Sequence, residues 1–309
     1  MSDLRARSNA ELLDAAFEIY RRHFAIFLAV GVVAALPMAL IQYSSLSLIG
    51  GQRGVMTVPD VAGGSFAMLQ VMLLVAYVVT LFITPFTEGI TVTTAARAYR
   101  GEAVELGDAT RAVFARPLAV LLAYWARFFL IMGAMMAIGI VGSIVVGILL
   151  AIFRPIGILL AIPLVIGVFA VAIVIWKRYF AVLPVLLVEE KRVADSMSRS
   201  RALADGNGAR IVVLIGLVIL ISMFFGIMLG GIAAALVSGL VGALLYLFCV
   251  ALVNQFAGVV LTLLYFDLRV RKEGYDIELL ASSLDPTPAA LPSDTTPPSS
   301  TPPSFPATA

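Results

Sequence analysis

The chain has 309 residues, of which 61% are hydrophobic and 13% are charged, and its formal net charge is +2. Soluble domains average about 45–50% apolar and about 25% charged residues, so a water-soluble globule of this length cannot hide this much apolar surface. One cysteine, Cys249, and one histidine, His23, exclude an intrachain disulfide and the usual structural zinc site, and we expect no cofactor. The small net charge gives no indication of a nucleic-acid partner. The composition predicts an all-α, polytopic membrane protein.

Residues 1–23 are expected to form an amphipathic helix at the membrane interface. Ser8 and Glu11 have the spacing of a capping box, which begins a helix. Apolar side chains then recur at spacings of three and four and define one face: Leu13, Phe17, Tyr20 and Phe24. This pattern is typical of a helix that lies in the headgroup layer before the chain enters the bilayer.

Six apolar segments follow, each of about the 20 residues or more that a membrane helix needs. They cover residues 24–49, 66–90, 118–150, 156–176, 211–236 and 240–264. Pro37, Pro85 and Pro163 lie within or near these segments, and membrane helices tolerate prolines where neighbours satisfy the carbonyls that they leave free. The turn between the last two segments is predicted at Gly230-Gly231 or at Ser238-Gly239.

Lys and Arg are distributed unevenly between the two predicted sides of the membrane. Of the 21 such residues, 18 lie in the N-terminal segment, in the loops 91–117 and 177–210, or after residue 264. Arg53 and Arg154 lie on the other side. This bias predicts that both termini and the two long loops are cytoplasmic. A basic face with amphipathic helices in turn predicts contacts with anionic lipid headgroups.

The sequence also predicts a threefold repeat, in which a cytoplasmic amphipathic helix precedes a membrane hairpin. An acidic residue opens each proposed unit: Asp14, Asp108 and Asp195. In the even-numbered spans, three polar residues then fall at equivalent distances from the cytoplasmic exit: Glu88, Lys177 and Asn254. Internal repeats are frequent in transporters, although they also occur in membrane proteins that transport nothing.

Glu88, Arg127 and Asn254 are the candidate site residues within the membrane. Glu88 lies near the inner end of the second span, and Arg127 lies about ten residues into the third. Ionisable groups at this depth are costly unless they are paired or hydrated, so they mark functional positions by default. Glu88 and Arg127 either pair between adjacent helices or reach separately toward the headgroups. Asn254 joins them through the repeat.

Two further patterns predict structure and no chemistry. Gly139, Ser143 and Gly147 have the small-x-x-x-small spacing that allows helices to approach closely. After the last span, Asp267 and Arg271 are four residues apart and are expected to pair on one helical face, and Gly274 offers a helix stop.

Three stretches together resemble a known bacterial membrane family. They are TPFTEGITVTTAARAYRGEAVELGDATRA at 84–112, SMSRSRALADGNGARIVV at 196–213 and LLYFDLRVRKEGYDIELL at 263–280. The family is named after the membrane domain of some glycerophosphoryl diester phosphodiesterases and includes stand-alone relatives with six spans. The resemblance implies a helical bundle in the bacterial cytoplasmic membrane. It implies no phosphodiesterase activity, because that chemistry belongs to a separate soluble barrel, and it assigns no functional residue here.

We therefore expect a six-helix membrane domain over 24–264, after the N-terminal segment 1–23. A juxtamembrane segment at 265–284 and a disordered tail at 285–309, with eight prolines, complete the chain. The expected function is that of a non-enzymatic scaffold or accessory protein acting through lipid or protein contacts. The alternative is a transporter or lipid-handling permease with a polar site near Glu88 and Arg127.

Overall fold

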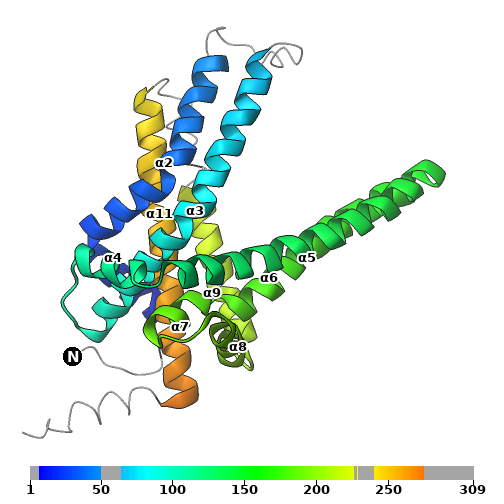
Figure 1. Ribbon diagram of the computed structural model, residues 1–309. Helices are drawn as coiled ribbons and strands as arrows, with labels where there is room; N and C mark the ends of the chain where they lie inside the picture. The colour runs from blue at the N-terminus through cyan, green and yellow to red at the C-terminus, as the bar shows by residue number, and fades with distance from the viewer. Residues whose placement is uncertain (1–6, 50–63, 226–227, 229–239, 275–309) are drawn as a thin grey trace, which may run out of the picture.

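The computed structural model describes residues 7–49, 64–225, 228 and 240–274, and these residues form helices joined by short connections, with no strand among them (Figure 1). The short helices are α1 (Asn9–Arg22), α4 (Leu106–Phe114), α7 (Val182–Val188) and α8 (Val193–Ala204). The longer helices are α2 (Phe24–Ile49), α3 (Gly64–Arg100), α5 (Pro117–Ile152), α6 (Arg154–Tyr179), α9 (Gly208–Met223) and α11 (Leu240–Glu273). The all-α class expected from the composition is confirmed.

Four helical stretches are long and apolar enough to cross a membrane: Gln70–Arg100, Pro117–Ile152, Arg154–Val188 and Leu244–Glu273. Two bent helix pairs raise the number to six if each pair counts as one span. The bends are 89° between α1 and α2 and 102° between α8 and α9. The chain is thus compatible with a multi-pass membrane protein. Both positions predicted for the turn between the last two spans, and the tail at 285–309, lie outside the described residues.

Two helices extend well beyond the apolar segments that predicted them. Helix α3 has 37 residues, which corresponds to about 55 Å against a hydrocarbon thickness of about 30 Å. It ends where Gly101 takes a φ of +74°, and α11 ends in the same way at Gly274, with a φ of +65°. Both glycines adopt the left-handed conformation that side chains disfavour. The helix stop predicted at Gly274 is therefore confirmed, although α11 continues without a break through the predicted end of its span at residue 264.

Helix α1 begins as predicted, but its buried face differs from the expected one. Ser8 accepts a hydrogen bond from the Glu11 N–H while the Glu11 side chain accepts one from the Ser8 N–H, which completes the capping box. The residues of α1 that are buried against the protein are Leu12, Ala16 and Tyr20. Phe17 is 58% exposed. The apolar stripe is therefore divided, and one part packs on the protein while Phe17 faces outward.

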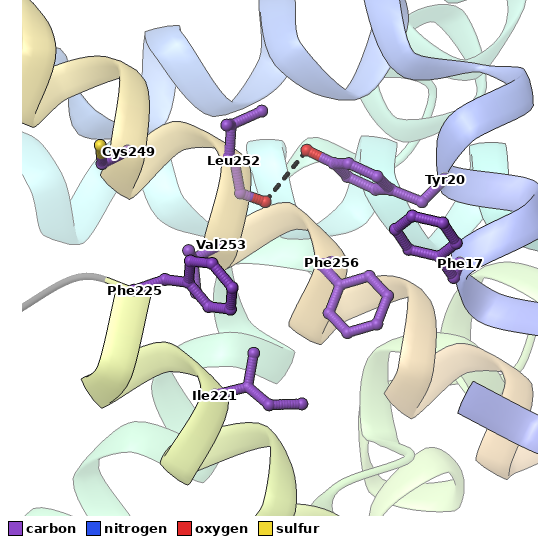
Figure 2. A pocket seen from close by; sticks show the side chains of 8 residues that line it. All are labelled: Phe17, Tyr20, Ile221, Phe225, Cys249, Leu252, Val253 and Phe256. Carbon is purple, nitrogen blue, oxygen red and sulfur yellow. Dashed lines mark hydrogen bonds between the residues drawn. The ribbon is translucent and has the colours of Figure 1, made fainter. Parts of the chain in front are cut away.

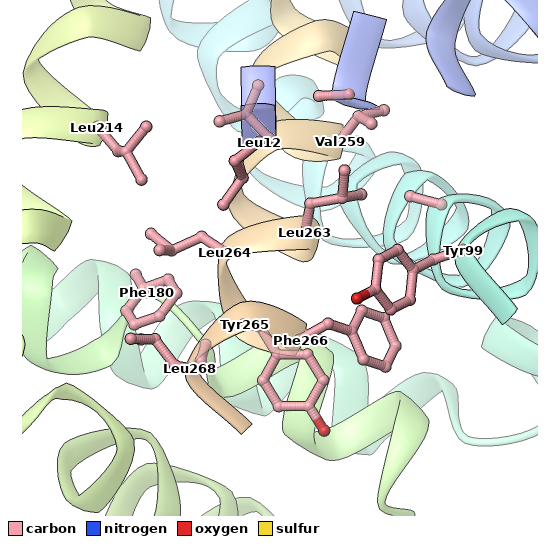
Figure 3. Close-up of a cluster of buried hydrophobic side chains, with 14 of the residues drawn as sticks. Leu12, Tyr99, Phe180, Leu214, Val259, Leu263, Leu264, Tyr265, Phe266 and Leu268 are labelled. Atoms are coloured by element: carbon pink, nitrogen blue, oxygen red, sulfur yellow. The ribbon is translucent and has the colours of Figure 1, made fainter. Parts of the chain in front are cut away.

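The main core surrounds the C-terminal half of α11 (Figure 3). Side chains from α1, α3, α7, α8 and α9 converge there on Leu263, Leu264, Tyr265 and Phe266. By contrast, α5 and α6 pack on each other and project away from the rest as a hairpin (Figure 1). In the most apolar stretch of α11, 44% of the residues are buried, whereas the corresponding stretches of α5 and α6 have none.

Candidate functional site

One contact between the hairpin and the rest of the protein lies where α5 crosses the proline of α3. Pro85 has no N–H, so the carbonyl of Leu81, four residues earlier, loses its helical partner. The Trp125 indole N–H of α5 donates to that carbonyl at 3.1 Å. The expectation that a neighbouring helix satisfies this carbonyl is confirmed. The indole ring also packs edge-on against Phe82 of α3, at 4.9 Å between ring centroids.

Glu88 and Arg127 form an ion pair beside this contact. Arg127 Nη2 lies 2.8 Å from Glu88 Oε1 and 2.7 Å from Oε2, so one guanidinium nitrogen serves both carboxylate oxygens. The Arg127 side chain is 10% exposed and the Glu88 side chain is 25% exposed. The guanidinium also stands over the Tyr124 ring at 5.3 Å from its centroid. Of the two arrangements considered for these residues, the structure has the one in which they pair.

Asn254, the third candidate residue, does not join this pair. It lies on α11 with its side chain exposed. Its neighbour Gln255 is buried and takes the polar contact between α11 and α3, because the Thr91 hydroxyl donates to its side-chain oxygen. The sequence pattern pointed to Asn254 and not to Gln255, because only tertiary packing distinguishes the inward-facing residue of two adjacent amides.

A buried carboxylate near the end of α11 holds three parts of the chain together. Asp267 is 3% exposed, and its carboxylate lies 2.8 Å from Arg271 Nε and 3.0 Å from Arg210 Nη2 of α9. The backbone N–H of Arg7 donates to Asp267 Oδ1 at 2.8 Å. The Arg7 carbonyl in turn accepts from Arg210 and Arg271, each at 2.6 Å. The predicted Asp267–Arg271 pair is confirmed, and it extends into a network that the sequence did not show.

A second carboxylate, Glu189, binds the other face of the same helix end. The Tyr265 hydroxyl donates to Glu189 Oε1 at 2.9 Å, and Arg199 Nε donates to Oε2 at 3.2 Å. Arg199 also bonds Glu273 at 2.6 Å. Burial acts to raise the pKa of Glu189, but hydrogen bonds from Lys191 and Tyr265 and the nearby arginine charges outweigh it, so the pKa is lowered. The carboxylate is therefore held ionised.

Ser200 joins α8 to the break between α6 and α7. Its hydroxyl donates to the Arg178 carbonyl at 3.0 Å and accepts from the Ala181 N–H at 3.2 Å. Both groups belong to the interrupted stretch where a continuous helix would have paired them. The Ser200 side chain is buried, so an unsatisfied carbonyl there would be costly. In the sequence, Ser200 stands out only as a member of the resembling stretch 196–213, because a serine that bonds to a distant backbone has no local pattern.

An apolar cavity of about 350 Å³ opens between α1, α9 and α11 (Figure 2). It is lined by Phe17, Tyr20, Ile221, Phe225, Cys249, Leu252, Val253 and Phe256. The Tyr20 hydroxyl already donates to the Leu252 carbonyl at 3.0 Å, as the dashed line in Figure 2 marks. The polar end of that side chain is thus satisfied, and the cavity presents an almost wholly apolar wall.

The end of α11 contacts residues of the other two stretches that carry the family resemblance. Arg199 and Arg210 come from the second stretch, and both bind the end of α11, which belongs to the third. Tyr99 of the first stretch stacks on Phe266 at 4.6 Å between ring centroids. Within the residues that the structure describes, no group of three or more His, Cys, Asp or Glu is placed to hold a metal ion. No protein-family profile, curated protein or solved structure matches the chain.

Proposed function

We propose that the chain is a non-enzymatic scaffold or accessory protein of the bacterial cytoplasmic membrane, acting through lipid or protein contacts. Both termini and the short helices lie on the cytoplasmic side in this proposal. The observation that carries it is the double anchorage of α11. Asp267 and Glu189 use opposite faces of one helix end to bind the N-terminal segment, α8 and α9. Such a cross-linked end is suited to presenting a fixed surface.

The orientation and the repeat belong to the same proposal. Each of α1, α4 and α8 is a short helix followed by a long apolar one, and each carries an arginine in its last turn: Arg21, Arg111 and Arg201. These three arginine side chains are exposed. Lying at the headgroup level, the helices would direct these charges toward anionic lipids of the inner leaflet. The bends of 89° and 102° at two of the three junctions support this placement.

Membership of the family named after the glycerophosphoryl diester phosphodiesterase membrane domain is also a proposal. Its support is that residues of the resembling stretches hold the end of α11 against its neighbours. Arg199, Ser200 and Arg210 of the second stretch each bind another helix or the segment beside it. In the third stretch, Tyr265 donates to Glu189, which Arg199 also binds, and Asp267 pairs with Arg210.

A lipid-handling permease is the second candidate, and the Glu88–Arg127 pair favours it. The pair lies where the hairpin meets α3, and the hairpin has its apolar surface open to lipid. A moving headgroup could exchange with either charge. We rank this function second because each charge already has its partner within 2.8 Å. An open transport site would leave such a charge free to bind substrate.

Reconstitution separates these two functions. The purified chain is placed in liposomes that contain a fluorescent phospholipid, and an external reductant measures the lipid that crosses between leaflets. The scaffold predicts a crossing rate equal to that of protein-free liposomes. A protein-dependent rate that Arg127→Gln abolishes, and that Arg111→Gln on the exposed face of α4 leaves unchanged, would establish the permease and overturn the scaffold.

Mass spectrometry of the protein in native-membrane particles tests the scaffold directly. A scaffold predicts a stoichiometric partner protein that remains bound after extraction with the surrounding lipid. A selectively retained lipid that is lost on Arg127→Gln, with no partner protein, would instead support lipid handling at the ion pair.

A further inference from the structure

From the geometry of the α1–α9–α11 cavity, we infer a binding site for one acyl chain of an anionic inner-leaflet phospholipid, with Arg21 holding the headgroup. This inference rests on the proposed lipid contacts at the cytoplasmic face and names the residues that make one of them. It departs from the sequence expectation, which placed the candidate site at Glu88, Arg127 and Asn254.

The chemistry of the wall specifies an apolar occupant. The lining side chains named for the cavity are aromatic or aliphatic apart from the Cys249 thiol and the Tyr20 hydroxyl. Tyr20 already donates to the Leu252 carbonyl, so it makes no demand on a ligand. A volume of about 350 Å³ is within the range of ligand pockets, roughly 300–1,000 Å³. Because an apolar cavity gains nothing from water, it favours a hydrocarbon.

The position of the cavity selects a lipid among apolar ligands. Helix α1 turns by 89° into α2, so α1 lies along the membrane plane when α2 crosses the bilayer. Its residue Phe17, on the cavity rim, is 58% exposed, in contrast to the buried Ala16 beside it. An outward-facing phenylalanine on such a helix lies at the boundary of headgroups and acyl chains. The cavity therefore opens where the acyl chains of the inner leaflet begin.

Arg21 supplies the charge that matches an anionic headgroup. It follows Phe17 by four residues and thus shares its face of α1. Its side chain is exposed, and the structure records no ion pair for it within the described part of the chain. An arginine one turn beyond an apolar rim can bind a phosphate while the attached chain enters the cavity.

Photolabelling of the full chain in lipid nanodiscs tests the site. The probe is phosphatidylglycerol with a diazirine in the middle of one acyl chain, and peptide mapping locates its adducts. We expect the yield on 249–256 of α11 to exceed several-fold the yield on 159–166 of α6, a stretch with lipid-exposed residues such as Leu159, which is 70% exposed. Adducts spread over all apolar helices in proportion to exposure would overturn the site.

Substitutions then distinguish a site from a labelled surface. Val253→Trp should fill the cavity and lower the α11 adducts several-fold, whereas Leu159→Trp on the hairpin should leave them unchanged. Ile221→Phe fills the cavity from the α9 side and is the second variant if Val253→Trp fails to fold. Equal α11 labelling in a folded filled variant and in wild type contradicts the proposal.

The headgroup contact is tested by lipid competition. Unlabelled phosphatidylglycerol should compete for α11 labelling several-fold better than phosphatidylcholine, and Arg21→Gln should remove this preference. Arg154→Gln, which also removes an exposed arginine but lies at the start of α6, is the matched control. If the preference survives Arg21→Gln, the assignment of Arg21 is wrong. The two proposals are tested by different results. Protein-dependent lipid crossing in liposomes would overturn only the scaffold function, and uniform labelling would overturn only the acyl-chain site.

Discussion

The end of α11 and the α5–α6 hairpin are both strongly apolar sequences, yet the fold surrounds one with protein and leaves the other open. In the most apolar stretch of α11, 44% of the residues are buried, and in those of α5 and α6 none is. This difference in burial matches the distribution of polar residues along the two segments. Helix α11 carries Tyr265, Asp267 and Arg269 near its end, whereas no Asp, Glu, Lys or Arg occurs in 128–153. Polar groups that must be paired specify neighbours, while a uniform apolar surface is equally well covered by lipid.

The largest expected effect tests the anchored region. Asp267→Ala removes the buried carboxylate that Arg210 and Arg271 share, and leaves the two guanidinium groups only the neutral Arg7 carbonyl as a common acceptor. We expect a loss of about 3 kcal/mol in the free energy of unfolding. Denaturant-driven unfolding in mixed micelles measures it.

The matched control is Asp108→Ala, whose side chain is 42% exposed and pairs at the surface with Arg97 and Arg111. It should cost less than about 1 kcal/mol. Equal losses for the two variants would remove the distinction between the end of α11 and the periphery.

Two glycines provide the next test. A methyl group on Gly31 of α2 would meet the backbone of α11, with the Ala251 carbonyl carbon at 2.9 Å, so Gly31→Ala must push the helices apart. We expect a cost of about 1–3 kcal/mol. Gly139→Ala on the hairpin meets nothing within 4 Å and should be neutral or slightly stabilising, because alanine favours a helix.

Melting temperatures of the two glycine variants in nanodiscs check this prediction. A loss at Gly139 as large as that at Gly31 would show that the hairpin packs more tightly than its open surface indicates. The Gly139–Ser143–Gly147 series would then serve close helix packing, as its spacing predicts. In the structure, a Cβ atom added at Gly139 or Gly147 meets no atom within 4 Å.

A smaller effect is expected at the attachment of the hairpin. Glu88→Gln and Arg127→Gln, alone and together, form a double-mutant cycle across α3 and α5. We expect a coupling free energy of about 1 kcal/mol, since the two groups touch and are largely shielded from water. Additive losses in the three variants would mean that the ion pair contributes nothing, and that the Trp125 contact with Leu81 attaches the hairpin without it.

The smallest effect is a pH dependence at the end of α11. The pKa of Glu189 is lowered from its ordinary value of 4.5, so its stabilising contribution is complete above that value and is lost as the pH falls through the folded-state pKa. Melting temperature measured from pH 6 to pH 3, which covers the range below 4.5, should fall less steeply for Glu189→Gln than for wild type. Glu102→Gln, an exposed pair partner of Arg100, should follow the wild-type curve.

What could be predicted from the sequence consists of features that depend on near neighbours in the chain. Three such features were predicted correctly: the Ser8–Glu11 capping box, the Asp267–Arg271 pair and the helix stop at Gly274. The first two connect residues three or four positions apart, and the third depends on a single glycine. The Glu88–Arg127 contact was one of two alternatives, since composition shows that both charges need a partner without showing that they meet.

Other features of the site could not have been predicted because they connect distant residues. Glu189 binds Tyr265, 76 positions later, and nothing near either residue indicates the contact. The sequence also did not indicate which residues of α1 pack on the protein, because Leu12 and Leu13 are equally apolar and only the position of α11 makes Leu12 fully buried and Leu13 partly so. The same holds for Gln255, which is buried where Asn254 is exposed.

The sequence by itself therefore determined that the chain is all-helical, apolar enough to cross a membrane several times, and strongly asymmetric in its distribution of positive charge. These properties follow from composition and from the period of the helix, which act locally. Only the tertiary structure decided that α11 is central and the α5–α6 hairpin peripheral, and that one face of α1 is left to border an apolar cavity. Apolar side chains attract one another without direction, so the choice among partners depends on shape and on the few polar groups that must be satisfied.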